Sequence, residues 1–484
     1  MELTDEQKKI AGYDLKPGEI LKVVAFAGSG KTSTLAAYAK ARPQSRFLYV
    51  AFNKSVQMEA EAKFPSNVTC KTAHALAFPK FGAPCKDRLV PGYKANTIMK
   101  ALGLDDYETA KCVIDTLLRY LVSSDPKIAS RHIPPRALEI LRQLGRTSDL
   151  VGHAVRLWDL MLSGEDSEVG MLHDGYLKLY QLSAPALSYD VILMDEAQDI
   201  NPVTADFLLN QQGAAKVIVG DSHQQIYSFR GAFDFIQFVA AKETLYLTQS
   251  FRFTPTIAAA ATMLLRYFKG EKRKIVGLNK QAPAEEVSGG RTIIARTNAR
   301  VFDEAVRLLR KKKRIGFVGP LSGYRFDRIV DAYYLYDEYV QQITDPFIRS
   351  FPDFQAMESY ARSAEDYEIA GICKVVREYR SKIPALVDQI KKAVSDRPEV
   401  ILTTAHKSKG LEWDVIQLAD DYAGIVDGDK LISPAKVHPD EINLIYVALT
   451  RGRQKVVPFP DFRIFAEKFY ALARGGVARQ AGGA

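Results

Sequence analysis

Short apolar runs alternate with longer stretches of helical periodicity along most of the chain. The runs at 20–26, 47–52, 191–194, 217–220 and 245–247 are short and lie between polar and turn-forming residues, which is typical of strands buried on both faces. Strands that alternate with helices in this way predict a doubly wound parallel sheet. We therefore expect an α/β core that closes near residue 250.

A second group of apolar runs, at 291–296, 314–318, 400–404 and 415–418, predicts a second sheet of the same kind. Each core is interrupted by a segment with mainly helical periodicity. The expected domains are the first core at 1–80 and 186–250, its insertion at 81–185, the second core at 251–322 and 398–470, its reduced insertion at 323–397, and a flexible tail at 471–484.

A glycine-rich loop follows the first predicted strand. Its residues, Ala25-Phe-Ala-Gly-Ser-Gly-Lys31-Thr32, lead into an alanine-rich helix, which is the context of a Walker A loop. Glycines allow backbone N–H groups to approach phosphate oxygens, the lysine can reach the β- and γ-phosphates, and the threonine hydroxyl can bind Mg²⁺. Ala25 replaces the first glycine of the strict pattern. The residues expected to hold a nucleotide are Gly28, Ser29, Gly30, Lys31 and Thr32.

An acidic pair ends a later buried strand, in the sequence Leu193-Met-Asp-Glu-Ala-Gln-Asp199. Ligands bind beyond the carboxyl ends of strands in α/β sheets, so Asp195 and Glu196 are expected beside the loop. Asp195 would bind Mg²⁺ directly or through water, and Glu196 would orient the attacking water. An ordinary glycine-rich turn is the alternative for the loop, but a chance match would not also bring this acidic pair. Together the two motifs predict an NTP-hydrolysing enzyme.

Composition gives weaker indications. The 484 residues predict three or more modules. The 66 Lys and Arg against 57 Asp and Glu give a net charge of +9, which suits a polyanionic partner without requiring one. The four cysteines lack Cys-x-x-Cys spacing, so zinc and iron–sulfur sites are not expected and a reducing compartment fits. The sequence contains no apolar signal core and no run of about 20 apolar residues, and we expect neither export nor a membrane partner.

Seven motifs follow one another in an order that resembles the superfamily 1 helicases of the UvrD/Rep group. They are Leu3-Thr-x-x-Gln7, Ala27-Gly-Ser-Gly-Lys-Thr32, Asp195-Glu-Ala-Gln-Asp199, Val219-Gly-Asp-Ser-His-Gln-Gln-Ile-Tyr-Ser-Phe-Arg-Gly231, Gln249-Ser-Phe-Arg252, Thr404-Ala-His-Lys-Ser-Lys-Gly-Leu-Glu412 and Leu444-Ile-Tyr-Val-Ala-Leu-Thr-Arg451. Stretches at 46–55, 64–72, 173–179 and 296–306 are similar to the helicase region of the F-box DNA helicases. No F-box is expected, because the helicase region begins at residue 3. The resemblance implies two RecA-like motor domains, each with a mainly helical insertion.

The resemblance also implies which residues surround ATP. Gln7 matches the glutamine that reads the adenine edge, Phe251 the ring that lies against the adenine, and Glu412 a residue that binds the ribose or nucleotide side. A polar residue on an exposed helix is the alternative for Gln7. The implied cofactors are ATP and Mg²⁺.

Three further residues match catalytic positions of the family. Gln224 matches the sensor of the γ-phosphate, and Arg252 and Arg451 match arginine fingers contributed by the second core. A guanidinium suits this role because it can bind two of the phosphoryl oxygens on which charge grows. A surface ion pair is the commoner role of any single arginine. With Glu196, these residues form the implied catalytic set.

Eight residues fall on motifs that line the single-strand path in relatives: Asn53, Lys54, Thr72, His74, Tyr227, Phe229, Arg230 and His406. Aromatic rings supply base stacking, and polar or basic groups hold phosphates. The family often has Trp at the position of Phe229, Phe at that of Ala73 and an aromatic residue near Ala51, so weaker or differently placed base contacts are expected. Core packing is the alternative for Phe52 and His74.

The implied activity is that of an ATP-dependent 3′-to-5′ DNA helicase that loads on single-stranded DNA or at single-strand/duplex junctions, in DNA repair or recombination control. One alternative is a translocase that strips bound proteins with little unwinding. Another is a nucleotide-gated DNA-binding clamp, against which the intact catalytic residues argue. A protein partner that recruits the enzyme or activates unwinding fits the first two. The expected location is the cytoplasm, with the nucleoid, in a prokaryote and the nucleus in a eukaryote.

Other conspicuous residues receive structural interpretations. The basic run Arg310-Lys-Lys-Lys-Arg314 is expected to end a solvated helix, with contact to duplex phosphates as the alternative. Trp158 is expected in the core of the first insertion, and His173 and Asp174 at a local structural corner.

The second insertion, about 75 residues long, is shorter than the duplex-engaging domain of the UvrD and Rep helicases. Poor unwinding of long duplexes by a monomer is therefore expected.

Overall fold

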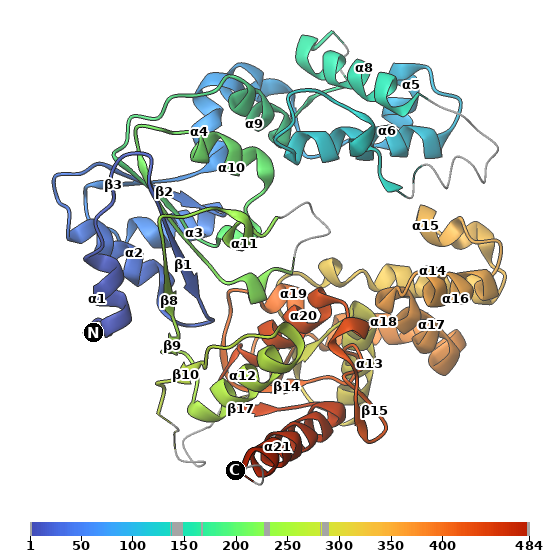
Figure 1. Cartoon of the computed structure of the whole chain (residues 1–484). Coiled ribbons are helices and arrows are strands. Elements are labelled where there is room, and N and C mark those ends of the chain that lie inside the picture. The colour runs from blue at the N-terminus through green and yellow to red at the C-terminus, as the bar shows by residue number, and fades with distance from the viewer. Residues whose placement is uncertain are drawn as a thin grey trace. The chain divides into compact units, whose positions relative to one another are not determined.

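The structure is a computed structural model that describes residues 2–135, 137, 149–165, 168–226, 233–280, 282 and 290–481. The chain divides into two compact units (Figure 1). The first comprises Met1–Ala25 and Gly30–Leu247, and the second comprises Phe26–Ser29 and Thr248–Ala484. Each unit contains a parallel sheet and buried hydrophobic clusters of its own.

Six strands form the sheet of the first unit: β1 (Ile20–Ala25), β2 (Phe47–Ala51), β3 (Val68–Thr72), β6 (Val191–Met194), β7 (Ala215–Gly220) and β8 (Glu243–Leu247). Their order is β3-β2-β6-β7-β1-β8, and all neighbours are parallel. Strands β2, β6 and β7 are buried along their whole length, which explains their largely apolar sequences. The expected doubly wound parallel sheet is confirmed.

Both faces of this sheet are covered. Along β2, Leu48 and Val50 join one hydrophobic cluster, whereas Phe47 and Tyr49 join another, because successive side chains of a strand point to opposite faces. The described helices of this core are α1 (Asp5–Ala11), α2 (Lys31–Lys40), α3 (Lys54–Glu61), α10 (Pro202–Leu209) and α11 (Phe235–Phe238).

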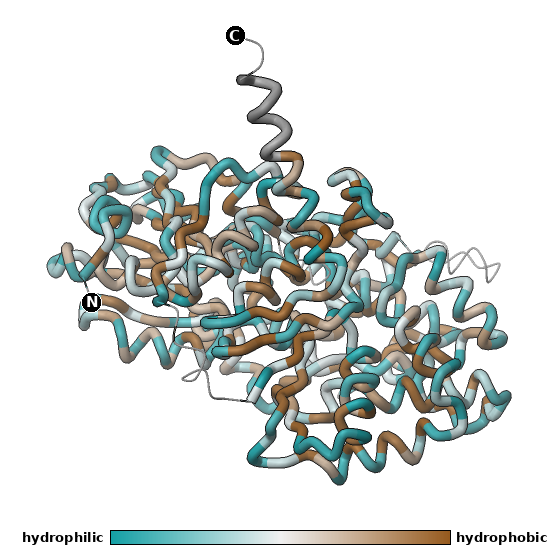
Figure 2. The backbone as a smooth tube through the Cα atoms, turned by 90° about the horizontal axis from the view of Figure 1, so that it is seen from below, coloured by the Kyte–Doolittle hydropathy of each residue, from teal (hydrophilic) through white to brown (hydrophobic). Residues whose placement is uncertain are grey.

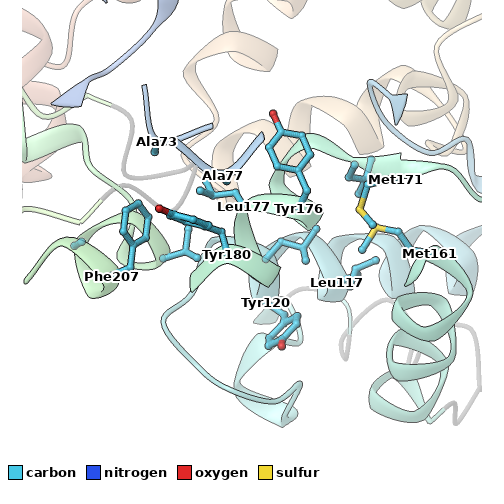
Figure 3. Close-up of a cluster of buried hydrophobic side chains, with 14 of the residues drawn as sticks. Ala73, Ala77, Leu117, Tyr120, Met161, Met171, Tyr176, Leu177, Tyr180 and Phe207 are labelled. Carbon is cyan, nitrogen blue, oxygen red and sulfur yellow. The ribbon is translucent and has the colours of Figure 1, made fainter. Parts of the chain in front are cut away.

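A mainly helical segment lies between β3 and β6. It contains α4 (Ala73–Ala77), α5 (Ala95–Leu102), α6 (Tyr107–Val122), α8 (Leu150–Ser163) and α9 (His173–Leu182), and its short strands β4 (Leu89–Val90) and β5 (Met171–Leu172) pair in parallel. Helix α9 packs on α10 through Tyr180 and Phe207, whose ring centroids are 5.3 Å apart. One hydrophobic cluster therefore runs from the sheet into this segment (Figure 3). Trp158 is half-buried and packs edge-on against Tyr120, as expected for a residue at this core.

Five parallel strands form the main sheet of the second unit: β11 (Arg291–Ala295), β12 (Ile315–Phe317), β13 (Val400–Thr404), β14 (Trp413–Leu418) and β17 (Gly452–Val457). Their order is β12-β13-β11-β14-β17. Four of them match the expected apolar runs, and β17 was not predicted. The short strands β9 (Gln249–Ser250) and β10 (Val276–Gly277) pair separately, as do β15 (Val426–Asp427) and β16 (Lys430–Leu431).

Helices of the second unit fall into two groups. Those of the core are α12 (Pro255–Lys269), α13 (Asn298–Arg310), α19 (Ala405–Ser408), α20 (Pro439–Leu449) and α21 (Pro460–Ala481). Those between β12 and β13 are α14 (Phe326–Tyr336), α15 (Pro346–Arg349), α16 (Phe354–Ser363), α17 (Tyr367–Tyr379) and α18 (Ile383–Ala393). Figure 2 shows hydrophobic and hydrophilic residues alternating along many helices, as amphipathic packing requires. Within the described part of the chain, no helix is long and apolar enough to span a membrane.

The inserted helices of the second unit are fastened to its core at α13. The carboxylate of Glu368, on α17, accepts hydrogen bonds from the N–H groups of Asn298 and Ala299 at 2.8 and 3.3 Å. At the other end of α17, the Tyr379 hydroxyl donates to Asp303 at 2.5 Å. An acidic side chain on a helix N-terminus is favourable for both the orphan N–H groups and the helix dipole. Helix α17 is therefore part of the packing of the second core.

Candidate functional site

The predicted Walker A loop connects β1 to α2. Gly28 and Gly30 have φ angles of +72° and +77°, a left-handed conformation that residues with a side chain rarely adopt. Gly30 precedes α2, and no side chain of the described residues caps this helix end. The first N–H groups of α2 thus form a helix N-terminus suited to an anion such as phosphate.

The segment Phe26–Ser29 of this loop belongs to the second unit. The Ser29 hydroxyl donates to the Phe26 carbonyl at 2.7 Å and holds the turn. Within the second unit, the Phe251 N–H donates to the Gly28 carbonyl at 2.9 Å. A Cβ at Gly28 would lie 2.5 Å from Cβ of Arg252, so only glycine permits this approach. Two residues expected at the nucleotide, Phe251 and Arg252, therefore lie beside the segment Phe26–Ser29 within the second unit.

The Lys31 and Thr32 side chains meet the acidic pair inside the first unit. The Thr32 hydroxyl donates to Asp195 Oδ2 at 2.9 Å, and Lys31 Nζ lies 3.2 Å from Glu196 Oε1. Asp195 is 4 % exposed. A hydroxyl and a carboxylate that converge in this way are hard oxygen ligands of the kind Mg²⁺ prefers. The residues present therefore fit a magnesium ion between Thr32 and Asp195.

Burial and neighbouring charges shift the ionisation of this cluster. Burial, and next the charge of Glu196, raise the pKa of Asp195 above its ordinary value. Burial alone would lower the pKa of Lys31, but the carboxylates of Glu196, Asp195 and Asp221 outweigh it, so the pKa is raised and the amine stays charged. The cluster therefore places several carboxylates around the single buried cation of Lys31. A bound metal ion would offset the remaining negative charge.

Two further side chains hold the acidic pair, and the sequence argument missed both. The Tyr49 hydroxyl, on β2, donates to Asp195 Oδ2 at 2.9 Å. Gln198 Nε2 donates to Glu196 Oε2 at 2.6 Å. Glu196 itself has a φ of +49°, an uncommon backbone conformation of the kind that clusters at functional sites.

Gln224, the expected γ-phosphate sensor, joins the same network. Its Nε2 donates to Asp221 Oδ2 at 2.7 Å, and the Asp221 N–H donates to Gln198 Oε1 at 2.9 Å. The side chains that end β6 and β7 are thus linked through Gln198. Gln198 stands inside the Asp-Glu-Ala-Gln-Asp motif, so its motif position was the signal that could have identified it.

Gln7 is buried, with 1 % exposure, which contradicts the alternative of a polar residue on an exposed helix face. Its Nε2 donates to the Thr34 hydroxyl on α2 at 3.1 Å, and its Oε1 accepts from the Thr4 N–H at 3.0 Å. The structure therefore places Gln7 against α2, the helix that follows the glycine-rich loop.

Arg252, Glu412 and Arg451 come together in the second unit. Arg252 Nε donates to Glu412 Oε2 at 2.8 Å, and Arg252 Nη1 donates to the Thr450 carbonyl at 3.3 Å. Arg451 is 1 % exposed, and its Nε donates to the Val447 carbonyl at 2.9 Å. Both arginines are thus held within the unit, Arg252 by an ion pair and Arg451 mainly by the backbone.

The predicted DNA-contact residues have mixed surroundings. The Asn53 and Thr72 side chains cap α3 and α4 by accepting from the N–H group of the third residue of each helix. Lys54 is exposed and His406 is half-buried. Phe52 is 54 % exposed, so the core-packing alternative for this ring is wrong. Three of the residues, Tyr227, Phe229 and Arg230, lie outside the described part of the chain.

His74 has a partner that the sequence could not reveal. Its Nε2 lies 3.1 Å from Asp174 Oδ1, a residue 100 positions away, and its ring packs edge-on against Tyr176 at 5.8 Å. His173 in turn contacts the Tyr176 hydroxyl at 3.2 Å. The expected local corner at His173 and Asp174 is therefore one side of a contact with α4.

Two helicase domain families match the chain. The UvrD/REP helicase N-terminal domain matches residues 178–244, and the UvrD-like helicase C-terminal domain matches residues 340–457.

Curated relatives agree with these matches. The chain is 34% identical over 492 residues to F-box DNA helicase 1 of Gallus gallus, covering 94% of this chain and 48% of the relative. It is 34% identical over 535 residues to F-box DNA helicase protein 1 of Schizosaccharomyces pombe, covering 99% and 59%. A third relative, the ATP-dependent DNA helicase UvrD2 of Mycobacterium tuberculosis, is 22% identical over 341 residues, covering 55% and 46%. The chain thus spans about half the length of these relatives. The sheets, the motifs and both domain matches agree with the resemblance: the chain matches the N-terminal helicase domain of the UvrD-like family over residues 178–244 and the C-terminal one over residues 340–457.

Proposed function

We propose that this chain is an ATP-dependent DNA translocase and helicase that moves 3′ to 5′ along single-stranded DNA. The observation that carries the proposal is the convergence of Thr32, Asp195, Lys31 and Glu196 at the loop between β1 and α2. Catalytic phosphoryl transfer needs a metal, a mobile cation and a base for water, and these four side chains supply groups for each.

Thr32 and Asp195 would hold Mg²⁺, which when bound offsets the charge of the phosphates. Lys31 now pairs with Glu196 at 3.2 Å. Lys31 would turn to the β- and γ-phosphates, and Glu196 would then accept a proton from the attacking water. Gln198 would keep the Glu196 carboxylate in place through its 2.6 Å hydrogen bond. Nucleotide binding would thus free the Glu196 carboxylate from Lys31, so that it can act as the general base.

Arg252 and Arg451 would sense the nucleotide from the second unit. The Arg252 ion pair with Glu412 is 40 % exposed on the carboxylate side, and such a pair contributes little stability. Arg252 can therefore leave Glu412 and bind phosphate oxygens at a small cost in free energy. The proposed DNA-contact residues, including Lys54, His74 and His406, would couple strand binding to this exchange of partners by Arg252. We propose that the enzyme acts in DNA repair or recombination control.

A strand-clearing translocase is the second candidate. The described helices α14 to α18 occupy the insertion between β12 and β13, and α17 is packed into the core through Glu368 and Tyr379. A small insertion that is fixed to the motor offers limited surface for bending a duplex. This feature favours removal of bound proteins over long unwinding.

An ATPase assay with single-stranded DNA, duplex DNA and RNA tests the proposal. Single-stranded DNA should stimulate hydrolysis, and Glu196→Gln should keep ATP and DNA binding while turnover falls by orders of magnitude. Glu467→Gln, at an exposed position on α21, is the matched control and should behave as wild type. Hydrolysis that ignores DNA, or normal turnover in Glu196→Gln, would contradict the mechanism. Strand displacement and streptavidin removal on the same tailed substrates then separate the two candidates.

A further inference from the structure

The positive charge of the chain is concentrated in two short segments of the second unit. Residues 310–314 and 380–399, which are 25 residues together, contain ten Lys and Arg against three Asp and Glu. They contribute +7 of the formal +9, which leaves +2 for the other 459 residues. We call these two segments the basic face.

The segments of the basic face lie side by side. The Ser395 N–H donates to the Ile315 carbonyl at 2.9 Å, and the Glu399 N–H donates to the Arg314 carbonyl at 3.0 Å. The Arg310 guanidinium, in the first segment, lies 5.4 Å from the centre of the Tyr379 ring. Tyr379 directly precedes the second segment in the sequence. Helices α13 and α18 are also neighbours in Figure 1. The charges therefore share one surface.

All ten cations of the basic face are exposed, and most of them lack an ion-pair partner among the residues that the structure describes. The exposed cations are Arg310, Lys311, Lys312, Lys313, Arg314, Arg380, Lys382, Lys391, Lys392 and Arg397. Lys313 and Arg314 share Glu399, and Lys391 lies 3.2 Å from Asp388. The other seven form no ion pair with any residue that the structure describes.

Helix stabilisation explains only part of this charge. Basic residues favour the last turn of a helix, and α13 and α18 both end on the basic face. Lys382 and Arg397, however, lie before and after α18 and outside its last turn. Seven unpaired like charges also repel one another. A bound polyanion would therefore relieve this repulsion.

We propose that the basic face binds the phosphate backbone of duplex nucleic acid. Among the described residues, none of the exposed large aromatic side chains lies on this face, whereas single-strand sites stack bases on such rings. A duplex offers one phosphate charge per about 1.7 Å of axis and is held by backbone contacts of this kind. Helix α18 has 11 residues, a length of about 16 Å, which matches roughly five base pairs of duplex. The surface lies outside the nucleotide and single-strand residues proposed above.

Equilibrium binding of a blunt duplex without nucleotide tests this proposal in the whole chain. The test variant replaces Lys311, Lys382, Lys391 and Lys392 by Gln. The control replaces the exposed Lys272, Lys274, Lys430 and Lys436 of the same unit by Gln, so both variants lose the same charge. Binding is measured by anisotropy between roughly 50 and 200 mM salt.

The test variant should lose duplex affinity by about tenfold or more, and its salt slope should fall by roughly three to four, because each lost phosphate contact removes about 0.9 from the slope. The control should stay near wild type, and Arg at the four test positions should restore binding. Single-strand-stimulated ATPase should remain in the test variant. This separates the proposal from the proposed function, whose failure would appear as absent stimulation in the wild type.

Three results would overturn the duplex assignment. The first is an equal loss in test and control variants, which would mean that only total charge matters. The second is an equal loss of single-strand and duplex affinity. The third is unchanged duplex binding in the test variant.

Discussion

Removal of the Tyr49 hydroxyl is a direct test of how Asp195 is held. Tyr49 and Thr32 both donate to Oδ2 of this buried carboxylate, each at 2.9 Å. When Thr32 turns to Mg²⁺, Tyr49 would remain as the donor on Oδ2. A hydrogen bond to a charged group contributes about 1.5–3 kcal/mol. Because the Glu196 N–H still donates to Oδ1 at 2.8 Å, we expect Tyr49→Phe to lose the lower part of this range, about 1.5–2 kcal/mol.

This loss should appear as a change in magnesium requirement. About 1.4 kcal/mol corresponds to a factor of ten, so half-saturating Mg²⁺ for DNA-stimulated ATPase should rise by roughly 10–30-fold. Tyr93→Phe is the control, since its hydroxyl donates to the Gly170 carbonyl at 2.6 Å in the first helical segment. That variant should lose stability without a shift in Mg²⁺ dependence. A Tyr49→Phe titration that overlays the wild type would refute the role of Tyr49 in placing Asp195.

Three other substitutions probe coupling and stability. Arg252→Ala should keep its affinity for single-stranded DNA, and its DNA-stimulated ATPase activity should fall by about 100-fold or more. Arg451→Lys should have the same effect without leaving a large cavity. Wild-type stimulation in both variants would mean that these arginines have only a structural role. Burial lowers the pKa of Lys178 to about 8, below its value in the unfolded chain. The unfolded state therefore binds more protons than the folded state between about pH 8 and 10.4. Because of this difference, Lys178 should make the free energy of unfolding rise with pH in that range, by up to about 3 kcal/mol. Lys178→Met should remove that rise in denaturation curves, and an identical pH dependence in both proteins would contradict the assignment.

Much of the fold was predictable because burial on both faces leaves a clear sequence signal. Strands β2, β6 and β7 are almost continuous apolar runs, and all three were expected. Strand β17 was not, since Gly452-Arg-Gln-Lys-Val-Val mixes polar and apolar residues and is only partly buried. A strand at the edge of a sheet faces solvent and carries a weaker pattern. Of the four edge strands, β3 and β17 were missed and β8 and β12 were expected, whereas every central strand of the two main sheets was expected.

The candidate site shows a similar division. Motif spacing identified Lys31, Thr32, Asp195 and Glu196, and the structure brings their side chains into contact. Tyr49 was missed because it reaches Asp195 only when β2 lies next to β6, and strand order is not written in local sequence. His74 and Asp174 were judged separately for the same reason. Contacts between distant segments depend on topology, which periodicity does not encode.

The position of β1 within the first sheet has a consequence for synthesis of the protein. Its neighbours are β7 and β8, with Leu21 opposite Val217 and Glu243. The strand that precedes the glycine-rich loop therefore emerges from the ribosome about 200 residues before either neighbour. At about 5–20 residues per second, this delay lasts roughly 10–40 s. During that time an apolar strand has no native pairing, and long-range strand pairing is slow. Nascent chains that stop before β7 should thus depend on chaperones, while β2 and β3 can already pair with each other.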